Sequence, residues 1–231
     1  MPTFEELPVN EAVALAVVVE ELVARLFHKP LDEETLAFIR DVDLEDGSDP
    51  ICADAQMRAG LADMQEFCRK DEPGEVLRAA SDDFNKLFVG PGHKPCPPWS
   101  SVYADGKWLV NGPTAQKVKS AFKAEGFAIP EGNREPWDHI SYALQFMADE
   151  QKSLFDQDDN AAGGQATGNA QSVTKARDFF AKFMAGWIPT FLDGVEREAR
   201  TEFYKGLAVF ARGVMGVQES VLNRLAPACT A

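Results

Sequence analysis

Apolar side chains recur at helical spacing from one end of the sequence to the other, and this pattern limits the fold more than any other feature. The clearest stripes, at i, i+4, i+7 and i+11, are Leu15, Val19, Leu22 and Leu26, followed by Met57, Leu61, Met64 and Cys68. Each stripe gives a helix one apolar face that packs against a core. No internal repeat and no alternation long enough for a sheet accompanies them. The sequence therefore predicts an all-α fold, a single helical-bundle-like domain over residues 1–231.

Residues typical of helix ends set the expected boundaries. Asn10 stands at an N-cap position and Pro30 closes the same segment, which predicts a helix over about 10–28. Pro73 is well placed at the first position of another helix, which must stop at Gly90 and Pro91. Further helical segments are expected at 36–39, 114–123, 136–154, 172–187 and 203–214.

Irregular segments interrupt this pattern at three places. Six of the nine residues 90–98 are Gly or Pro, so an ordered or extended loop is expected there. Asp105 and Gly106 suit a tight turn between residues 101–103 and 107–110, where a tiny hairpin can form. Residues 158–172 are rich in Gly, Ala and Asn and read as a flexible linker before the C-terminal helices. The linker could act as a hinge for exchanging those helices between two copies, so the chain is expected to be a monomer or a domain-swapped dimer.

The charge of the chain argues against nucleic acid as a partner. The sequence has 37 acidic and 23 basic side chains, a net charge of −14, together with 45% hydrophobic residues. The apolar fraction is too high for a disordered chain, and the charge is too negative for binding phosphate backbones or anionic membrane surfaces. A cationic peptide or protein segment would instead be attracted.

Cofactor and membrane motifs are absent from the sequence. The four cysteines, Cys52, Cys68, Cys96 and Cys229, form no CxxC pair, and the three histidines are scattered. These spacings predict no metal site and no redox site, and the cysteines are expected to be buried apolar residues. The longest apolar run, 12–19, is too short to span a bilayer and lacks a basic leader, so the cytoplasm is the expected location.

Three ordered motifs bear a family resemblance over about residues 75–215. Leu87–Pro91 with Pro97–Tyr103 resembles the LFxGP and PPWxSVY stretch of the TorD/DmsD family of redox-enzyme maturation chaperones, and Glu135–His139 resembles its EPxDH box. The ending of that family, WxxxF and FYxxLA, is similar to a set of residues here: Trp187, Phe191, Phe203, Tyr204, Leu207 and Ala208.

The resemblance implies an all-helical cytoplasmic chaperone without catalysis. Such a protein binds the twin-arginine leader peptide and the apoprotein of a molybdenum-containing oxidoreductase, DMSO/TMAO reductase-like, before export. Leader-binding residues of the family fall here on Leu87, Phe88, Pro98, Trp99, Pro136, Asp138 and His139. To these we add neighbouring residues of the same motifs: Ser101, Tyr103, Glu135 and Trp137.

Elementary chemistry agrees with this implication. A leader with paired arginines and a moderately apolar run needs carboxylates beside an exposed apolar groove. Candidate carboxylates are Asp82, Asp83, Glu135 and Asp138. Candidate groove residues are Leu87, Phe88, Trp99 and Tyr103. A guanidinium can also stack on Trp99 or Trp137.

Other interpretations of the same residues stay open. Leu87, Phe88 and Trp99 can be core residues, and Glu135, Pro136 and Asp138 can be an ordinary helix start. Asp138 and His139 could serve a small hydrolase or nucleotide-binding enzyme, although neighbours on a helix point about 100° apart. A nucleotide or pterin contact has no supporting motif. The client could also be a redox subunit without a leader, or the chain could be a structural adaptor.

Overall fold

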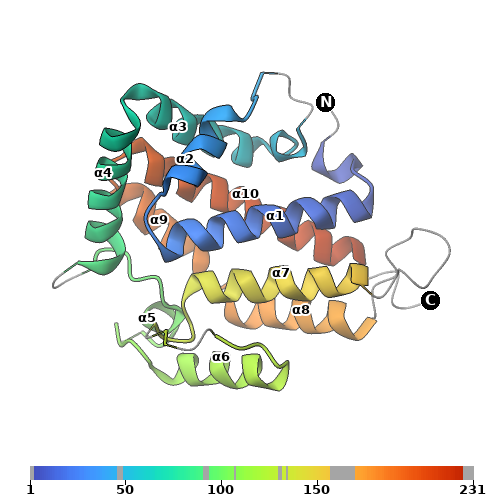
Figure 1. The fold of residues 1–231 in the computed structure, drawn as a ribbon. Helices are drawn as coiled ribbons and strands as arrows, with labels where there is room; N and C mark the ends of the chain where they lie inside the picture. Colours follow the sequence, from blue (N-terminus) through green and yellow to red (C-terminus); the bar gives the residue numbers. More distant parts are fainter. Residues whose placement is uncertain are drawn as a thin grey trace. The chain divides into compact units, whose positions relative to one another are not determined.

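The described part of the computed structural model is helical. It comprises residues 3–45, 49–90, 94–106, 108–129, 132–133, 135–156 and 170–225 (Figure 1). The α-helices among these residues are α1 (Val9–His28), α2 (Glu33–Asp41), α3 (Ala55–Lys70), α4 (Pro73–Phe84), α5 (Ser100–Ala104), α6 (Pro113–Ala124), α7 (Ile140–Asp156), α8 (Ala170–Phe183), α9 (Ile188–Glu198) and α10 (Glu202–Leu225). Shorter helical turns are η1 (Phe4–Glu6), η2 (Pro50–Cys52) and η3 (Asn85–Val89). The predicted all-α class is confirmed.

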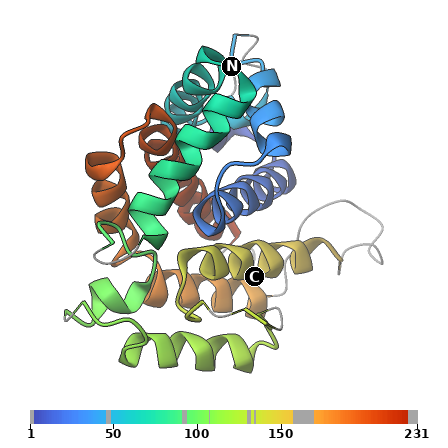
Figure 2. The ribbon, with the colours of Figure 1, turned by 60° about the vertical axis from the view of Figure 1, so that its left-hand side comes forward.

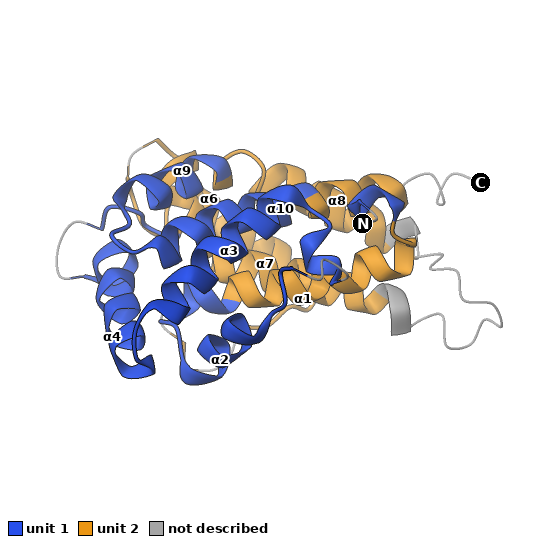
Figure 3. Cartoon of the chain, turned by 90° about the horizontal axis from the view of Figure 1, so that it is seen from above, with its two compact units in different colours: residues 1–6, 25–98, 189–216 blue, residues 7–24, 99–188, 217–231 orange. Residues whose placement is uncertain are grey.

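The helices group into two compact units, which Figure 3 colours separately. Unit 1 consists of residues 1–6, 25–98 and 189–216, and unit 2 of residues 7–24, 99–188 and 217–231. The long helices α1 and α10 each give one part to unit 1 and the other part to unit 2. The single domain expected from the sequence stays a prediction.

An aromatic cluster fills the core of unit 1. The ring centroid of Phe88 lies 5.2 Å from that of Phe84, 5.7 Å from Tyr204, 5.8 Å from Phe27 and 6.1 Å from Phe191. Most of these pairs meet edge to face, the arrangement that aromatic rings prefer. Phe88 reaches the cluster from a π-helical turn that continues α4 and closes with a hydrogen bond of 2.6 Å from the Gly90 N–H to the Asn85 carbonyl.

Helices α3 and α10 approach each other at backbone distance within unit 1. A Cβ added to Gly60 would lie 2.3 Å from the Phe210 nitrogen, and one added to Gly206 would lie 2.6 Å from the Gly60 carbonyl oxygen. Real Cβ atoms do not approach backbone so closely, so glycine is required at both positions for this packing.

In unit 2, α7 and α8 lie side by side and α6 lies along the same pair (Figures 1 and 2). Phe122 of α6 joins them, because its ring centroid lies 5.2 Å from that of Phe146 on α7 and 5.3 Å from that of Phe179 on α8. Burial of the apolar stripe of α6, which also contains Ala115 and Val118, explains why this lysine-rich helix is held in the unit.

Three polar side chains are buried together in unit 2. The Gln151 Nε2 donates hydrogen bonds to Glu20 Oε2 at 2.9 Å and to Gln218 Oε1 at 2.8 Å. Burial of the carboxyl raises the pKa of Glu20 well above its ordinary value, the Gln151 hydrogen bond lowers it, and the nearby Glu21 charge raises it further. Folding therefore favours the protonated, neutral form of the Glu20 carboxyl.

Several sequence expectations are confirmed by these elements. Helix α1 matches the predicted 10–28 segment, and α4 starts at Pro73 and ends with η3 before Gly90. The Met57–Cys68 stripe is completely buried. Cys52, Cys68 and Cys96 are buried free thiols, and burial raises the pKa of Cys68 and of Cys96 to about 12.

The hairpin expected at Asp105–Gly106 is wrong. Residues 100–104 form helix α5, whose first backbone N–H groups have acceptors from another segment, so the helical conformation is stabilised there. Residues 157–169 of the expected linker lie outside the described residues, and residues 170–172 already belong to α8. None of the described helices combines the length and apolar character that crossing a bilayer requires.

Candidate functional site

Asp138 holds the first turn of the short helix α5. Its Oδ2 accepts a hydrogen bond of 2.7 Å from the Ser101 N–H and one of 3.3 Å from the Ser100 hydroxyl. Its backbone carbonyl accepts the Ser100 N–H at 3.0 Å. The residue before α5 is Trp99, whose side chain makes no capping hydrogen bond, so the acceptors come from a residue distant in sequence. Asp138 is 2% exposed. It caps α5 from a part of the same chain that is distant in sequence.

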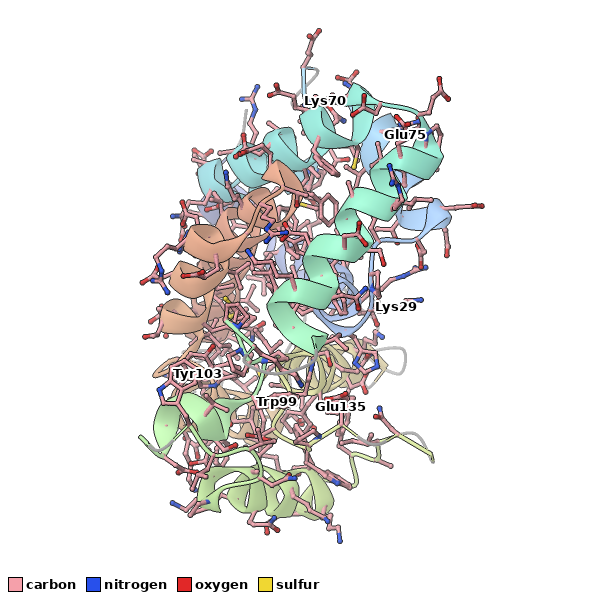
Figure 4. All side chains as sticks on the ribbon, turned by 90° about the vertical axis from the view of Figure 1, so that its left-hand side faces the viewer. Lys29, Lys70, Glu75, Trp99, Tyr103 and Glu135 are labelled. Carbon is pink, nitrogen blue, oxygen red and sulfur yellow. The ribbon has the colours of Figure 1, made fainter. Side chains whose placement is uncertain are left out.

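Trp99 and Glu135 connect the same two segments. The Trp99 indole N–H donates to Glu135 Oε2 at 3.3 Å, and Trp99 forms an isolated antiparallel β-bridge with His139. The indole is buried, whereas Glu135 is exposed, and Figure 4 shows the two lying beside each other. The arrangement presents a carboxylate to solvent from a fixed position.

His139 is oriented from its own helix start. Its Nδ1 accepts the Ser141 N–H at 3.1 Å and lies 2.7 Å from the Ser141 hydroxyl oxygen. Its ring meets the Trp99 indole edge to face, with centroids 6.4 Å apart. These hydrogen bonds of Asp138 and His139 therefore go to different partners, and both side chains are buried, which is the geometry of a structural joint rather than of an acid/base pair.

Leu87, Phe88 and Pro98 belong to unit 1 and are buried there. Leu87 is completely buried and its carbonyl accepts the Cys96 N–H at 3.3 Å, while Phe88 is the centre of the aromatic cluster. In unit 1, these three residues are buried, and the Leu87 carbonyl fixes the backbone at Cys96.

The remaining predicted site residues lie in unit 2. Ser101 of α5 is completely buried. Tyr103 is half-buried, and its ring is stacked on that of Trp187, with centroids 5.4 Å apart and an interplanar angle of 28°. Pro136 and Trp137 are half-buried, and the Lys119 Nζ lies 5.2 Å from the Trp137 ring centroid. Unit 2 therefore contains Trp99, helix α5 and the EPxDH segment as one hydrogen-bonded assembly.

A surface segment next to this assembly was not anticipated as part of the site. Trp108, Leu109 and Val110 are 59%, 52% and 47% exposed. The Trp108 ring lies 6.2 Å from that of Tyr103, which connects the segment to α5. A signal was available in the sequence, because three consecutive apolar residues stand between turn-forming residues where neither face of a helix could bury them all.

Metal chemistry has no support in the described residues. No group of three His, Cys, Asp or Glu side chains among them is arranged to hold an ion.

Comparison with known proteins identifies the family. A family model described as nitrate reductase delta subunit matches residues 52–193, more than half of the chain. The chain belongs to this family, the TorD family. Chaperone protein TorD of Vibrio cholerae serotype O1 (strain M66-2) is 26% identical over 215 residues, covering 88% of this chain and 90% of that protein. Tat proofreading chaperone DmsD of Salmonella typhi is 25% identical over 197 residues, covering 85% of each.

Among solved structures, the crystal structure of a predicted redox enzyme maturation protein from Archaeoglobus fulgidus is similar to this TorD-family chain. The TM-score is 0.49 with 19% identity, and the match covers 88% of this chain and 93% of that one. The curated relatives are named as chaperones, and the family is one of chaperones, not of enzymes, so the predicted family and the predicted non-enzymatic role are confirmed.

Proposed function

We propose that this chaperone binds the twin-arginine leader of a molybdenum-containing oxidoreductase precursor, DMSO/TMAO reductase-like, and holds the precursor in the cytoplasm until its cofactor is inserted. The names of the relatives, TorD and Tat proofreading chaperone DmsD, support a role before export. The identity of the client and the binding of its leader are the parts of this proposal that go beyond membership of the family.

One observation carries the proposal to a site. Glu135 presents an exposed carboxylate beside the buried Trp99 indole, on a scaffold fixed by the Asp138 hydrogen bonds to α5. An arginine side chain forms charge-assisted hydrogen bonds with a carboxylate and stacks on aromatic rings. A preorganised acceptor loses little side-chain freedom on binding, which favours affinity.

The predicted site residues then divide into two roles. The accessible residues Glu135, Pro136, Trp137 and Tyr103 meet the leader. The buried residues Ser101, Asp138 and His139 with Trp99 in unit 2, and Leu87, Phe88 and Pro98 in unit 1, keep the surfaces in place. This division makes Asp138 a positioning residue rather than the partner of an arginine.

Titration calorimetry with synthetic leaders tests the proposal. A leader from the client should bind with micromolar or tighter affinity, and replacing both arginines by lysine should weaken binding at least about tenfold, the size of one charge-assisted hydrogen bond. Glu135→Gln should weaken binding of the arginine leader more than binding of the lysine control, because a lysine ammonium keeps its charge but lacks the bidentate geometry of a guanidinium. Glu75→Gln is the matched control, because Glu75 is an exposed carboxylate on α4 of unit 1 (Figure 4).

Two outcomes would contradict the proposal. If no leader binds while the folded protein still forms a complex with a purified apo-molybdoenzyme subunit, the client is held without its leader. If Glu135→Gln and Glu75→Gln weaken binding equally, only the overall negative charge acts and Glu135 is not the site.

A further inference from the structure

The most exposed large apolar surface near the proposed site is the connection between α5 and α6. Trp108, Leu109 and Val110 follow one another there, and each is about half exposed. Of the four residues that sequence chemistry expected to form the apolar groove, Leu87 and Phe88 are buried in unit 1 and Trp99 is buried in unit 2, and Tyr103 is half-buried. An apolar ligand segment therefore needs another surface, and this connection offers one.

The connection is fixed at both ends. Asp105, directly after α5, accepts the Thr114 hydroxyl at 2.6 Å through Oδ1 and the Thr114 N–H at 3.1 Å through Oδ2. Gly112 lies against this carboxylate, since a Cβ there would be 2.3 Å from Asp105 Oδ2. The carboxylate thus closes the loop and caps α6, whose own N-cap residue has no side chain to do so.

The backbone of the loop is strained. Trp108 and Asn111 have φ values of 51° and 62°, in the left-handed region that a bulky residue such as tryptophan rarely adopts. Left-handed backbone costs an L-residue roughly 1–2 kcal/mol. A large apolar side chain held on strained backbone and exposed to solvent is the kind of feature that points to a binding role.

Charge gives the surface a direction. Residues 106–124 contain four lysines and no acidic residue, in a chain whose net charge is −14. Lys117, Lys119 and Lys123 of this stretch lie on α6. The exposed carboxylate of Glu135 instead accepts the indole N–H of Trp99, which precedes α5, whereas Trp108 follows α5. Of the α6 lysines, Lys119 lies over Trp137 of the EPxDH box. In Figure 4, Trp99 lies between Tyr103 and Glu135.

The span between the two surfaces suits a short piece of extended peptide. Helix α5 has five residues and is about 7.5 Å long at about 1.5 Å per residue. An extended peptide covers that length with two or three residues at about 3.3 Å each. Tyr103, in the last turn of α5, extends the surface on the loop side, because its ring lies 6.2 Å from that of Trp108.

We propose that Trp108, Leu109 and Val110 bind the apolar run of the leader, so that the leader lies along α5 in one direction, with its arginines at Glu135 and its apolar run at the loop. The inference rests on the proposed function. The reverse direction would leave the arginine pair without a carboxylate partner at the loop, because residues 106–124 contain no acidic residue.

A double-mutant cycle tests the direction. The probe is the synthetic twin-arginine leader that the wild-type chaperone binds, with two variants: arginines replaced by glutamine, and the apolar run replaced by serine. Trp108→Ala should weaken binding of the intact leader about tenfold. It should leave the affinity for the serine variant of the leader almost unchanged. Glu135→Gln should show the opposite dependence, coupling to the arginines alone. Phe38→Ala is the control, an aromatic residue of α2 in unit 1 that is 47% exposed.

The outcomes separate the two proposals. If wild-type protein binds no leader, the proposed function fails and this inference fails with it. If wild-type binds but Trp108→Ala and Leu109→Ser both bind the intact leader like wild-type, the loop is not the subsite while the function stands. Coupling of Trp108 to the arginines rather than to the apolar run would overturn the direction. Trp108→Phe, which keeps an apolar ring, should retain most of the affinity and excludes misfolding as the cause of loss.

Discussion

The Asp138 Oδ2 lies 2.7 Å from the Ser101 backbone nitrogen and accepts its hydrogen, so a residue just before α7 caps the first turn of α5. The PPWxSVY and EPxDH motifs are therefore two halves of one joint. Helix α5 depends on the second motif, since its first two backbone N–H groups, those of Ser100 and Ser101, donate to Asp138.

The joint makes Asp138 a stability residue. Asp138→Ala removes the acceptor of two hydrogen bonds in a buried place, and we expect the free energy of unfolding to fall by about 1–3 kcal/mol. Denaturant unfolding measures this directly. Glu219→Ala, which changes an exposed carboxylate of α10 in the same unit, should change stability by less than about 0.5 kcal/mol. Equal losses in the two variants would contradict the capping role.

Asp83 does the same work in unit 1. Its Oδ2 accepts the Arg200 N–H at 2.9 Å, the Thr201 N–H at 2.8 Å and the Thr201 hydroxyl at 2.8 Å, just before α10. We expect Asp83→Ala to cost about 2–3 kcal/mol of unfolding free energy. Asp82→Ala changes the exposed neighbouring carboxylate and serves as the matched control, with little effect expected. A melting temperature unaffected by Asp83→Ala would contradict the capping role of Asp83 before α10.

Two glycines of α10 should respond in opposite ways to alanine. Gly206→Ala forces a Cβ to within 2.6 Å of the Gly60 carbonyl oxygen, so we expect a loss of about 2–3 kcal/mol or more. A Cβ added to Gly216 would have open space around it. Gly216→Ala should therefore raise the free energy of unfolding by about 0.5–1 kcal/mol, because alanine has less backbone freedom in the unfolded chain. Thermal unfolding of the two variants checks the pair, and a similar shift in both would contradict the close approach of α3 and α10.

Glu20 predicts a specific pH dependence. Its folded pKa is raised well above the ordinary value of 4.5, so the unfolded chain loses this proton first as the pH rises. The stabilisation from the protonated carboxyl is therefore complete below about pH 4.5 and is lost as the pH rises through the folded pKa. Glu20→Gln is neutral at every pH.

Unfolding free energies of wild type and Glu20→Gln across pH 4–8 test this dependence. The variant should gain stability relative to wild type as the pH rises, because it never carries the buried charge. A difference between the two proteins that stays constant over this range would show that folding does not raise the pKa of Glu20.

Local patterns in the sequence were enough for several helices, among them α1, α3 and α4, but not for α5 or α9. The buried Met57–Cys68 stripe and the Pro73 start of α4 are read from spacing and from backbone chemistry, which act within a few residues. The caps provided by Asp83 and Asp138 could not be read in this way. Each joins residues 37 or more apart in sequence, and such pairs are set by packing of the whole unit.

The candidate site shows the same division. Glu135 and Trp137 were predicted from the box and are accessible, whereas Trp99 and Asp138 are buried because their polar atoms are engaged within the joint. The Trp108–Val110 surface was assigned to a hairpin strand, since a turn at Asp105–Gly106 favours one. The hydrogen bonds from Thr114 to the Asp105 carboxylate instead cap α6 directly after this segment.

The left-handed backbone at Trp108 has a consequence for laboratory evolution. Glycine adopts such a backbone without steric conflict, so Trp108→Gly relieves strain while removing an indole that is 59% exposed. A library screened for heat resistance alone should therefore collect glycine or asparagine at this position, whereas a library screened for leader capture should keep tryptophan. Sequencing both pools would show whether the chain gives up folding free energy at this loop in return for recognition.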